Sequence, residues 1–359
     1  MKIGLVYEHA LLSGGYPRDL RWLASGLAAL GSEVCVFSKP GGERDGLVAD
    51  VWLRDLGELN RFDCELYHVF GIFRLPQARL LLQTVARNKP LVVSPWGQLM
   101  PFHLLKGRFK KSLYLAALKP WFRRVRWWHV FSALEAASVH NYLGAPVNTF
   151  CAGLGVYPVG EDRDEAGQGN LPKGTELLFM GRNDVYQKGI DLLLKGYALA
   201  RQQGLPWRLT IAGVEHRNSA EHITGFIREN RLENAVTLLG KVSERDKTKL
   251  FRQTRYLVFL SRFDGPPRPV REAIAVGTPV IVSPQTNMAE EIDAFGAGLS
   301  VDPRPQEVAG VLLQISRDEA LYRRHREAVP RLRERLAWPQ IAKDYLEGYT
   351  NVLEEEHND

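Results

Sequence analysis

Short apolar segments rich in β-branched residues alternate along this chain with stretches whose apolar residues recur every three or four positions. Strands that alternate with helices in this way pair as a parallel sheet, which the helices cover on both faces. The 359 residues suffice for two domains of ordinary size. We therefore predict an α/β protein of two domains. The strand segments are 2–7, 33–38, 64–70, 90–94 and 126–132 in the first half, and 176–181, 207–214, 235–240, 255–261 and 278–283 in the second.

A stretch without apolar periodicity separates the two halves. Residues 144–174 are rich in Gly, Pro and acidic side chains, a composition typical of a linker. A helical period returns in residues 338–356, close to the last residue of the sequence. Open α/β sheets bind ligands at the carboxyl ends of their strands, so two such sheets that face each other make a cleft.

The charge of the chain is unevenly distributed. Residues 66–134 hold twelve Lys and Arg and no Asp or Glu, although the whole chain has a net charge of only +6. Within this stretch, residues 106–128 also carry several aromatic side chains, a composition that suits an anionic membrane surface. The alternative is that Trp127 and Trp128 belong to the core and the cations are simply solvated. Nucleic-acid binding is disfavoured, because no recognition motif accompanies the charge.

The cysteines and the first residues indicate the compartment. Cys35, Cys64 and Cys151 form neither a CxxC motif nor a disulfide framework, which suits a reducing environment. The residues after Met1 lead directly into a strand-like segment and do not resemble a secretory signal. We therefore expect a cytoplasmic protein.

The segment GRNDVYQKG (181–189) places two cations after a predicted strand. Arg182 follows the strand and Lys188 opens the next helix. Two cations beside a helix N-terminus suit a diphosphate. If a sugar–diphosphate bond is cleaved, fixed cations stabilise the charge that develops on the leaving phosphate, and no metal is then required. The alternative is a pair of surface cations on a loop.

The segment 261–283 places two carboxylates around a second loop. Asp264 lies in a Gly- and Pro-rich loop after a predicted strand, and Glu272 lies on the short helix that follows. Carboxylates accept hydrogen bonds from vicinal hydroxyls, as on a ribose or a hexose. The alternative is that Asp264 caps the loop and Glu272 pairs with Arg268 or Arg271.

The histidines and the candidate helix-capping residues give weaker indications of function than the two charged segments. His68, His103 and His129 are too scattered to form a metal site, so we expect none. His68 ends a strand and is a candidate to line the cleft, with a structural histidine as the alternative. Ser132 and Glu135 follow a strand and are expected to cap a helix.

Together, segments 181–189 and 264–280 resemble glycosyltransferase family 4, a retaining family with the GT-B fold. GRNDVYQKG is similar to the family's G-R-x(n)-K-G segment, and DGPPRPVREAIAVGTPV to its E-G-F-G-L-P-x-x-E-A-x-A-x-G-x-P-V segment. The resemblance extends over most of the chain. Residues 13–38, 94–114, 287–292 and 338–349 look like the family's first Gly-rich loop and helix, its S-P-H-G-M-x-x-P segment, the segment after its last strand and its C-terminal crossover helix.

The resemblance implies two Rossmann-like domains that face each other across a cleft. Residues 1–155 with 339–359 would bind the acceptor, and residues 156–338 would bind the nucleotide-sugar. Residues 162–164 match the DxD metal–nucleotide triplet of the other glycosyltransferase fold, but no strand precedes them, so we give them no role.

The roles of individual residues follow from the same resemblance. Arg182 and Lys188 would bind the donor diphosphate, Glu272 the ribose hydroxyls, and Asp264 the transferred sugar. Trp96 and His68 are candidates to contact the sugar or the acceptor. The other expected donor contacts are Gly14, Gly15, Gly181, Val242, Gly265, Pro266, Arg268 and Pro269.

Three positions depart from the family pattern. Asp264 stands where the family has Glu, which shortens the reach of the carboxylate. Pro267 replaces Gly and so removes a backbone N–H. The following residue, Arg268, could supply a cation in its place. Trp96 replaces the His of S-P-H-G, and an indole cannot transfer protons. These changes bear first on the identity of the donor sugar.

The resemblance implies a retaining, metal-independent hexosyltransferase that uses a nucleotide-diphosphate sugar, with UDP or GDP expected, and no further cofactor. The acceptor is expected to be a lipid-linked or polysaccharide glycan of the bacterial envelope, which would place the enzyme on the cytoplasmic face of the membrane. Two alternatives stay open: a catalytically weak, nucleotide-sugar-binding partner subunit, or a transferase that acts on a soluble small molecule.

Overall fold

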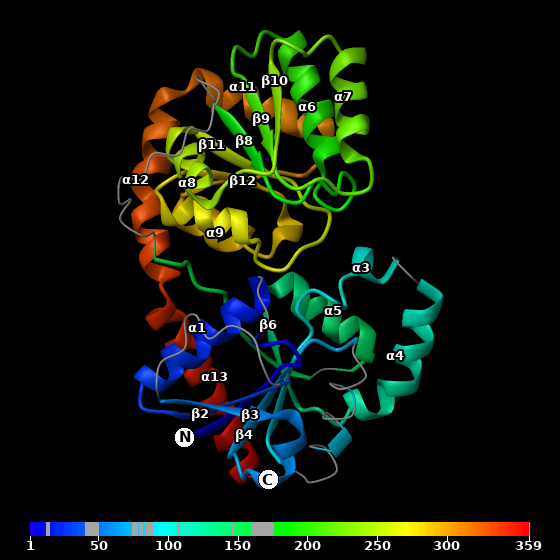
Figure 1. Cartoon of the computed structure of the whole chain (residues 1–359), viewed down its shortest axis with the longest axis vertical. Coiled ribbons are helices and arrows are strands. Elements are labelled where there is room, and N and C mark those ends of the chain that lie inside the picture. The colour runs from blue at the N-terminus through cyan, green and yellow to red at the C-terminus, as the bar shows by residue number, and fades with distance from the viewer. Residues whose placement is uncertain are drawn as a thin grey trace. The chain divides into compact units, whose positions relative to one another are not determined.

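The computed structural model describes residues 1–11, 15–39, 50–73, 78, 82–83, 89–105, 108–145, 147–158 and 176–358. These residues form two compact units (Figure 1). The first unit contains Met1–Gly155 and Leu336–Asp359, and the second contains Val156–Arg335. Each unit is an α/β body built around its own parallel sheet.

The first unit holds a sheet of seven parallel strands in the order β3-β2-β1-β4-β5-β6-β7. The central strands are buried along their whole length, which explains why they are short apolar runs without alternation. The strands are β1 Lys2–Val6, β2 Glu33–Ser38, β3 Val51–Asp55, β4 Leu66–Phe70, β5 Leu91–Ser94, β6 Trp127–Val130 and β7 Asn148–Cys151.

Helices cover this sheet, and the last helix of the chain is one of them. α13 packs against α1, so that the two ends of the chain meet in one unit (Figure 1). Trp22 of α1 stacks on Trp338 of α13, with ring centroids 6.4 Å apart. The helices are α1 Gly15–Ala29, η1 Leu56–Arg61, α3 Pro101–Leu105, α4 Arg108–Phe122, α5 Ala133–Leu143 and α13 Trp338–Asn358.

The second unit repeats the pattern with six parallel strands in the order β10-β9-β8-β11-β12-β13. The strands are β8 Leu177–Met180, β9 Leu209–Ala212, β10 Val236–Gly240, β11 Tyr256–Phe259, β12 Val280–Val282 and β13 Gly298–Ser300. The helices are α6 Ile190–Gln202, α7 Ser219–Glu229, α8 Glu244–Gln253, α9 Arg268–Ala275, η2 Pro284–Thr286, α10 Ala289–Phe295, α11 Pro305–Arg317 and α12 Glu319–Arg335.

Both strand orders are those of a doubly wound, Rossmann-like sheet. In the second unit the order reverses between β8 and β11, the point at which such sheets bind ligands. The prediction of two Rossmann-like α/β bodies is therefore confirmed. None of the helices in the described ranges has both the length and the apolar composition needed to cross a membrane.

Two predictions made from the sequence need correction. The stretch 144–174 is not linker throughout, because Asn148–Cys151 forms the edge strand β7, whose partly exposed residues lack a strong apolar pattern. The aromatic residues of 106–128 do not all face solvent: Trp127 and Trp128 are buried in β6, which confirms the alternative that they belong to the core.

Candidate functional site

The two predicted cations lie in the loop between β8 and α6. Arg182 follows Gly181, and its guanidinium donates to Gln187 Oε1 at 2.9 Å. About half of the Arg182 side chain is exposed, so its charge faces solvent at the carboxyl end of the sheet. Lys188, in contrast, is largely buried and reaches back toward the strands.

Lys188 joins the two predicted motifs. Its Nζ forms an ion pair with Asp264 Oδ2, and the side chain passes over the Phe259 ring of β11. Both charged groups are largely buried, which strengthens their attraction relative to that of a surface pair. Ser261 Oγ also donates to Asp264 Oδ2, at 3.2 Å. The loops after β8 and β11 therefore converge where the strand order reverses.

Gly189 permits this convergence. Its φ is +65°, and a Cβ at this position would lie 1.9 Å from the carbonyl oxygen of Leu260. Only glycine fits such an approach between the two loops. A second contact joins the loop after β11 to the first turn of α6, because Arg262 forms a bidentate ion pair with Asp191, both N–O distances being 2.8 Å. The hydrogen bond and charge of Asp191 raise the pKa of Arg262.

Two hydrogen bonds to the backbone of Asp264 hold the loop after β11. The Asp264 N–H donates to the Gln285 carbonyl at 3.1 Å, and the Asn287 side chain donates to the Asp264 carbonyl at 2.6 Å. Gly265, Pro266 and Pro267 are buried between Asp264 and α9. Pro267 is the N-cap residue of α9, and Arg268 and Pro269 begin the helix.

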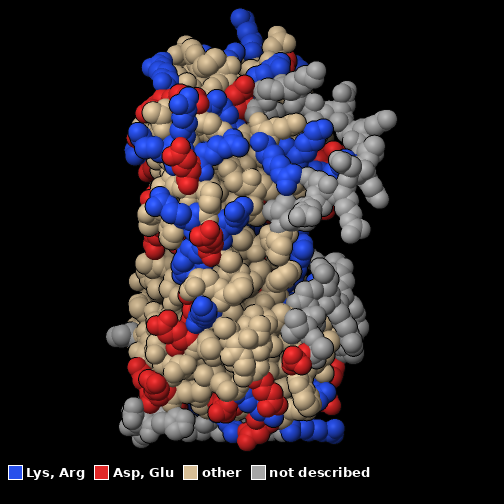
Figure 2. Space-filling view, turned by 90° about the vertical axis from the view of Figure 1, so that its left-hand side faces the viewer, with Lys and Arg blue, Asp and Glu red and all other residues tan. Residues whose placement is uncertain are grey.

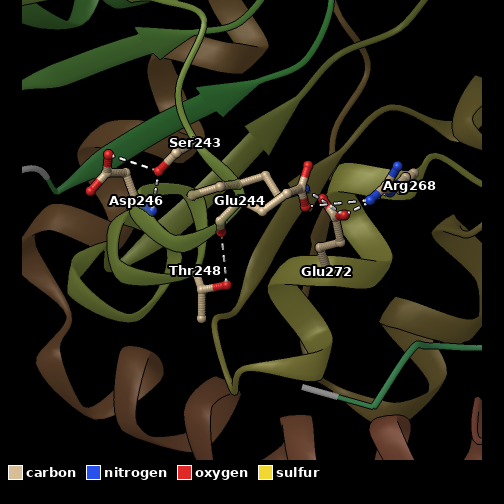
Figure 3. A network of polar contacts seen from close by, with 7 residues as sticks. Ser243, Glu244, Asp246, Thr248, Arg268 and Glu272 are labelled. Atoms are coloured by element: carbon tan, nitrogen blue, oxygen red, sulfur yellow. Dashed lines mark hydrogen bonds and ion pairs between the residues drawn. The ribbon is translucent and has the colours of Figure 1, made fainter. Parts of the chain in front are cut away.

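Glu272 of α9 lies in a network of four charged side chains (Figure 3). Its Oε1 accepts from Arg268 Nε at 2.7 Å and from Lys247 Nζ at 2.8 Å. Both cations also contact Glu244, the first residue of α8. Burial lowers the pKa of Arg268, but the charges of Glu272 and Glu244 outweigh it and raise the pKa. The pairing of Glu272 with Arg268 was one of the alternatives predicted from the sequence.

Lys247 was not predicted as a site residue. It lies on α8, whose first turn is capped by Ser243: the Ser243 Oγ accepts from the Asp246 N–H at 3.0 Å. Val242, an expected donor contact, is half-buried immediately before this cap. In a helix as polar as α8, a single lysine carries no signal that distinguishes it from a surface residue. Only the packing of α8 against α9 brings it to Glu272.

In the first unit, Trp96 follows β5 in the left-handed region, with a φ of +51°. Its ring stacks on Tyr16 with centroids 4.5 Å apart, and only 6% of the side chain is exposed. The Gly97 N–H donates to the buried carboxylate of Glu135, which also accepts from the Phe131 N–H at 2.8 Å. Burial raises the pKa of Glu135 to about 7, against the lowering effect of these two N–H groups.

Glu135, in the first turn of α5, therefore stabilises the turn at Trp96 through the Gly97 N–H. Ser132 caps this helix as predicted, accepting from the Glu135 N–H at 3.2 Å. A sugar that stacks on Trp96 would have to displace Tyr16. Gly15 is the first residue of α1, and Gly14 and residues 162–164 lie outside the described residues.

His68 is fully buried in β4, and both its ring nitrogens bind protein atoms. The network starts at the Ala152 carbonyl, which can only accept, so His129 donates to it through Nε2 at 2.9 Å. His129 Nδ1 then accepts from Ser94 Oγ, which in turn accepts from His68 Nε2, both at 2.6 Å. His68 Nδ1 is left to accept from Tyr349 Oη at 2.7 Å.

In this network all four ring nitrogens of the two histidines form hydrogen bonds. Burial lowers the pKa of His68 well below 6.5 and that of His129 to about 3, so both rings are neutral. His68 is therefore the structural histidine of the alternative prediction, and the structure does not place it to contact a sugar. It ties α13 to the centre of the first sheet.

Within the described part of the chain, no three His, Cys, Asp or Glu side chains are grouped so as to hold a metal ion. The donor set that the structure does assemble consists of cations and paired carboxylates at the carboxyl ends of β8 and β11. Such a set suits an anionic ligand that also bears hydroxyl groups.

Part of the chain is similar to known glycosyltransferases. Residues 161–331 match the family model described as glycosyl transferases group 1. The mannosylfructose-phosphate synthase of Agrobacterium fabrum is 29% identical over 197 residues, which cover 51% of this chain and 43% of that protein. The GDP-mannose:cellobiosyl-diphosphopolyprenol alpha-mannosyltransferase of Xanthomonas oryzae is 26% identical over 193 residues, covering 52% of this chain and 50% of the relative. The chain thus spans about half the length of these relatives.

Solved structures share the fold over the full length. Sucrose-phosphate synthase from Thermosynechococcus elongatus superposes with a TM-score of 0.70 at 19% identity, covering 99% of both chains. The Anabaena protein HepE in complex with UDP-glucose has a TM-score of 0.68 at 16% identity and covers 98% of this chain and all of its own. The GT-B fold implied by the family resemblance is confirmed. Residues 161–331 of the chain are thus similar to the glycosyl transferases group 1 family.

Proposed function

We propose that this protein transfers a hexosyl group from a nucleotide-diphosphate sugar to a hydroxyl group of a glycan, with retention at the anomeric carbon and without a metal ion. The observation that carries the proposal is the ion pair of Lys188 with Asp264, which joins the two family motifs at the point where the strand order reverses. The family match over residues 161–331, which contain both motifs, also supports it.

In this mechanism the donor diphosphate binds to Arg182 and Lys188. The bond between the anomeric carbon and the phosphate oxygen breaks, and the two cations stabilise the charge left on the diphosphate. The acceptor oxygen bonds to the anomeric carbon on the face that the diphosphate leaves, and its proton passes to the departing phosphate oxygen. Lys188 moves from Asp264 toward the phosphate as the donor enters, which frees the Asp264 carboxylate to accept from a sugar hydroxyl.

Glu272 would accept from the ribose hydroxyls. Because its Oε1 already accepts hydrogen bonds from Lys247 and Arg268, its Oε2 is the atom left to bind the ribose. Lys247 and Arg268 fix the orientation of this carboxylate before the donor arrives, which reduces the entropy lost on binding. Both are therefore positioning residues for the ribose.

The base and the acceptor follow from relatives and are proposed on that basis. GDP-mannose stands in the name of one relative, and UDP-glucose is bound in one structural neighbour, so we propose UDP or GDP. The same relative acts on a diphosphopolyprenol-linked glycan, which favours a lipid-linked acceptor of a bacterial envelope polysaccharide on the cytoplasmic side of the membrane. A soluble acceptor is the second candidate, favoured by the name of the mannosylfructose-phosphate synthase.

A donor panel tests the proposal. The purified protein is incubated with UDP-, GDP-, ADP- and TDP-sugars, with and without EDTA, while release of nucleotide diphosphate and thermal stability are followed. We expect one donor to turn over in EDTA. Lys188→Ala should lose this turnover, whereas the matched variant Lys195→Ala, on the exposed side of α6, should retain it. Stabilisation by one donor without turnover would favour the partner-subunit alternative, which the departures at Asp264, Pro267 and Trp96 support.

A further inference from the structure

Helix α4 presents an apolar face to solvent. Phe109 is 84% exposed and Leu113 is 67% exposed, and they follow one another at a spacing of four residues. At 100° per residue, Ala116 and Pro120 continue the same face over the next two turns. Leu105, at the end of the preceding helix α3, is 56% exposed. This face is the opposite of the usual arrangement, in which the outward side of a surface helix is polar.

The other face of α4 is firmly packed, so the exposed residues do not result from a helix that has come loose. Leu115 and Phe122 are buried in the core of the first unit. The Tyr142 hydroxyl donates to the Leu115 carbonyl at 2.7 Å, and the Tyr114 hydroxyl donates to the Ile72 carbonyl, also at 2.7 Å. Lys111 Nζ donates to the His103 carbonyl at 2.6 Å and so joins α4 to α3. A rigid helix thus carries apolar residues on both sides.

Cations flank the exposed stripe. On a helical projection Lys110 lies on one side of it, and Arg108 and Lys119 lie on the other. The surrounding sequence, residues 66–134, has no Asp or Glu to offset them. The face of the molecule that carries α12 differs, because there Lys and Arg are interspersed with Asp and Glu (Figure 2).

We propose that this face of α4 docks onto an anionic lipid bilayer, with Phe109 and Leu113 inserted below the headgroups and the flanking cations at the phosphates. A large aromatic and a large aliphatic side chain beside basic residues are the features by which a helix lies in a membrane interface. The proposal goes beyond the proposed function, because docking needs neither donor nor catalysis.

The charge favours a membrane over a second copy of the chain. A symmetric dimer through α4 would bring Arg108, Lys110 and Lys119 of the two copies together, and their repulsion would oppose association. An anionic bilayer attracts the same charge. The structure thus selects between the two occupants of an apolar face by electrostatic complementarity.

Flotation with lipid vesicles tests the docking. The full chain, without donor, is mixed with vesicles of phosphatidylcholine alone or of phosphatidylcholine with phosphatidylglycerol. We expect flotation only with the anionic vesicles, and weaker flotation at high salt. Phe109→Ser combined with Leu113→Ser should reduce the partition coefficient at least about tenfold, and Lys110→Glu at least about fivefold.

Two matched variants make the result specific. Trp52→Ser removes a 48% exposed aromatic residue from β3 of the same unit, and Lys195→Glu reverses an exposed charge on α6; both should float like the wild type. Thermal unfolding confirms that each variant is folded. Equal flotation of the wild type and the Phe109/Leu113 variant would overturn the proposal, as would failure to float with anionic vesicles. So would a wild-type dimer in sedimentation velocity that the same variant dissociates.

Discussion

The network Tyr349–His68–Ser94–His129 allows a prediction with a control of nearly identical shape. In Tyr349→Phe, the His68 Nδ1 atom loses the only donor that the structure gives it, because its Nε2 proton is already committed to Ser94. Leaving one buried acceptor without a partner costs about 1–3 kcal/mol of the free energy of unfolding. Replacing a hydroxyl by hydrogen changes the packing little, so this loss should dominate.

Tyr345 provides the control. It lies one turn before Tyr349 on α13 and is equally buried, but its hydroxyl has no hydrogen-bond partner among the described residues. Tyr345→Phe should therefore leave the stability unchanged or raise it, because it removes a buried polar atom that gains nothing in the fold.

Urea unfolding followed by circular dichroism measures both variants. Since the chain forms two units, the transition of the first unit must be resolved, and we assign it as the one that Gly189→Ala in the second unit does not shift. The prediction is a lower urea midpoint for Tyr349→Phe and not for Tyr345→Phe. Equal loss in the two variants would show that hydroxyl burial, and not the ordered network, determines the effect.

Three further predictions concern other positions. Gly189→Ala should destabilise the second unit by at least about 2 kcal/mol, because left-handed backbone disfavours a Cβ that would also meet the Leu260 carbonyl; chemical denaturation measures it. Lys247→Met should weaken donor binding by roughly 1–2 kcal/mol, since Glu272 loses a charged hydrogen-bond donor, and should do so with little change in kcat. Burial raises the pKa of Glu135 from its ordinary 4.5 to about 7, so its contribution to stability is fully present below pH 4.5 and is lost as the pH rises through 7. In unfolding at several pH values, the difference between the wild type and Glu135→Gln should accordingly change by about 2–3 kcal/mol between pH 5 and 8, and a constant difference would contradict this assignment.

The sequence predicts the centre of each sheet better than its edges. β4 and β11 are buried on both faces, so their apolar composition identifies them directly. The edge strands β3, β7 and β13 were not predicted, because partly exposed or very short strands need no apolar pattern and form by pairing with a neighbour. The strand order also follows from packing and not from local sequence.

In the candidate site, too, the sequence predicts some features and not others. Arg182, Lys188, Asp264 and Glu272 stand in motifs at strand ends, where spacing and chemistry indicate a ligand. The contact of Lys188 with Asp264 and the approach of Lys247 to Glu272 arise between segments far apart in the chain, so no local pattern encodes them. Similarly, aromatic composition in 106–128 drew attention to Trp127 and Trp128, which are buried, whereas the exposed face of α4 depends on which side of the helix meets the core.

The central claim is that the second unit binds a nucleotide diphosphate through Lys188 and Glu272. Titration calorimetry of UDP and GDP in EDTA, with the wild type, Lys188→Ala, Glu272→Gln and Lys195→Ala, tests it most directly. We predict that one nucleotide binds to the wild type and to Lys195→Ala, and that each of the other two variants loses at least about tenfold in affinity, as expected for the loss of a charged contact. Undiminished binding in both Lys188→Ala and Glu272→Gln, or no binding of either nucleotide to the wild type, would contradict the account.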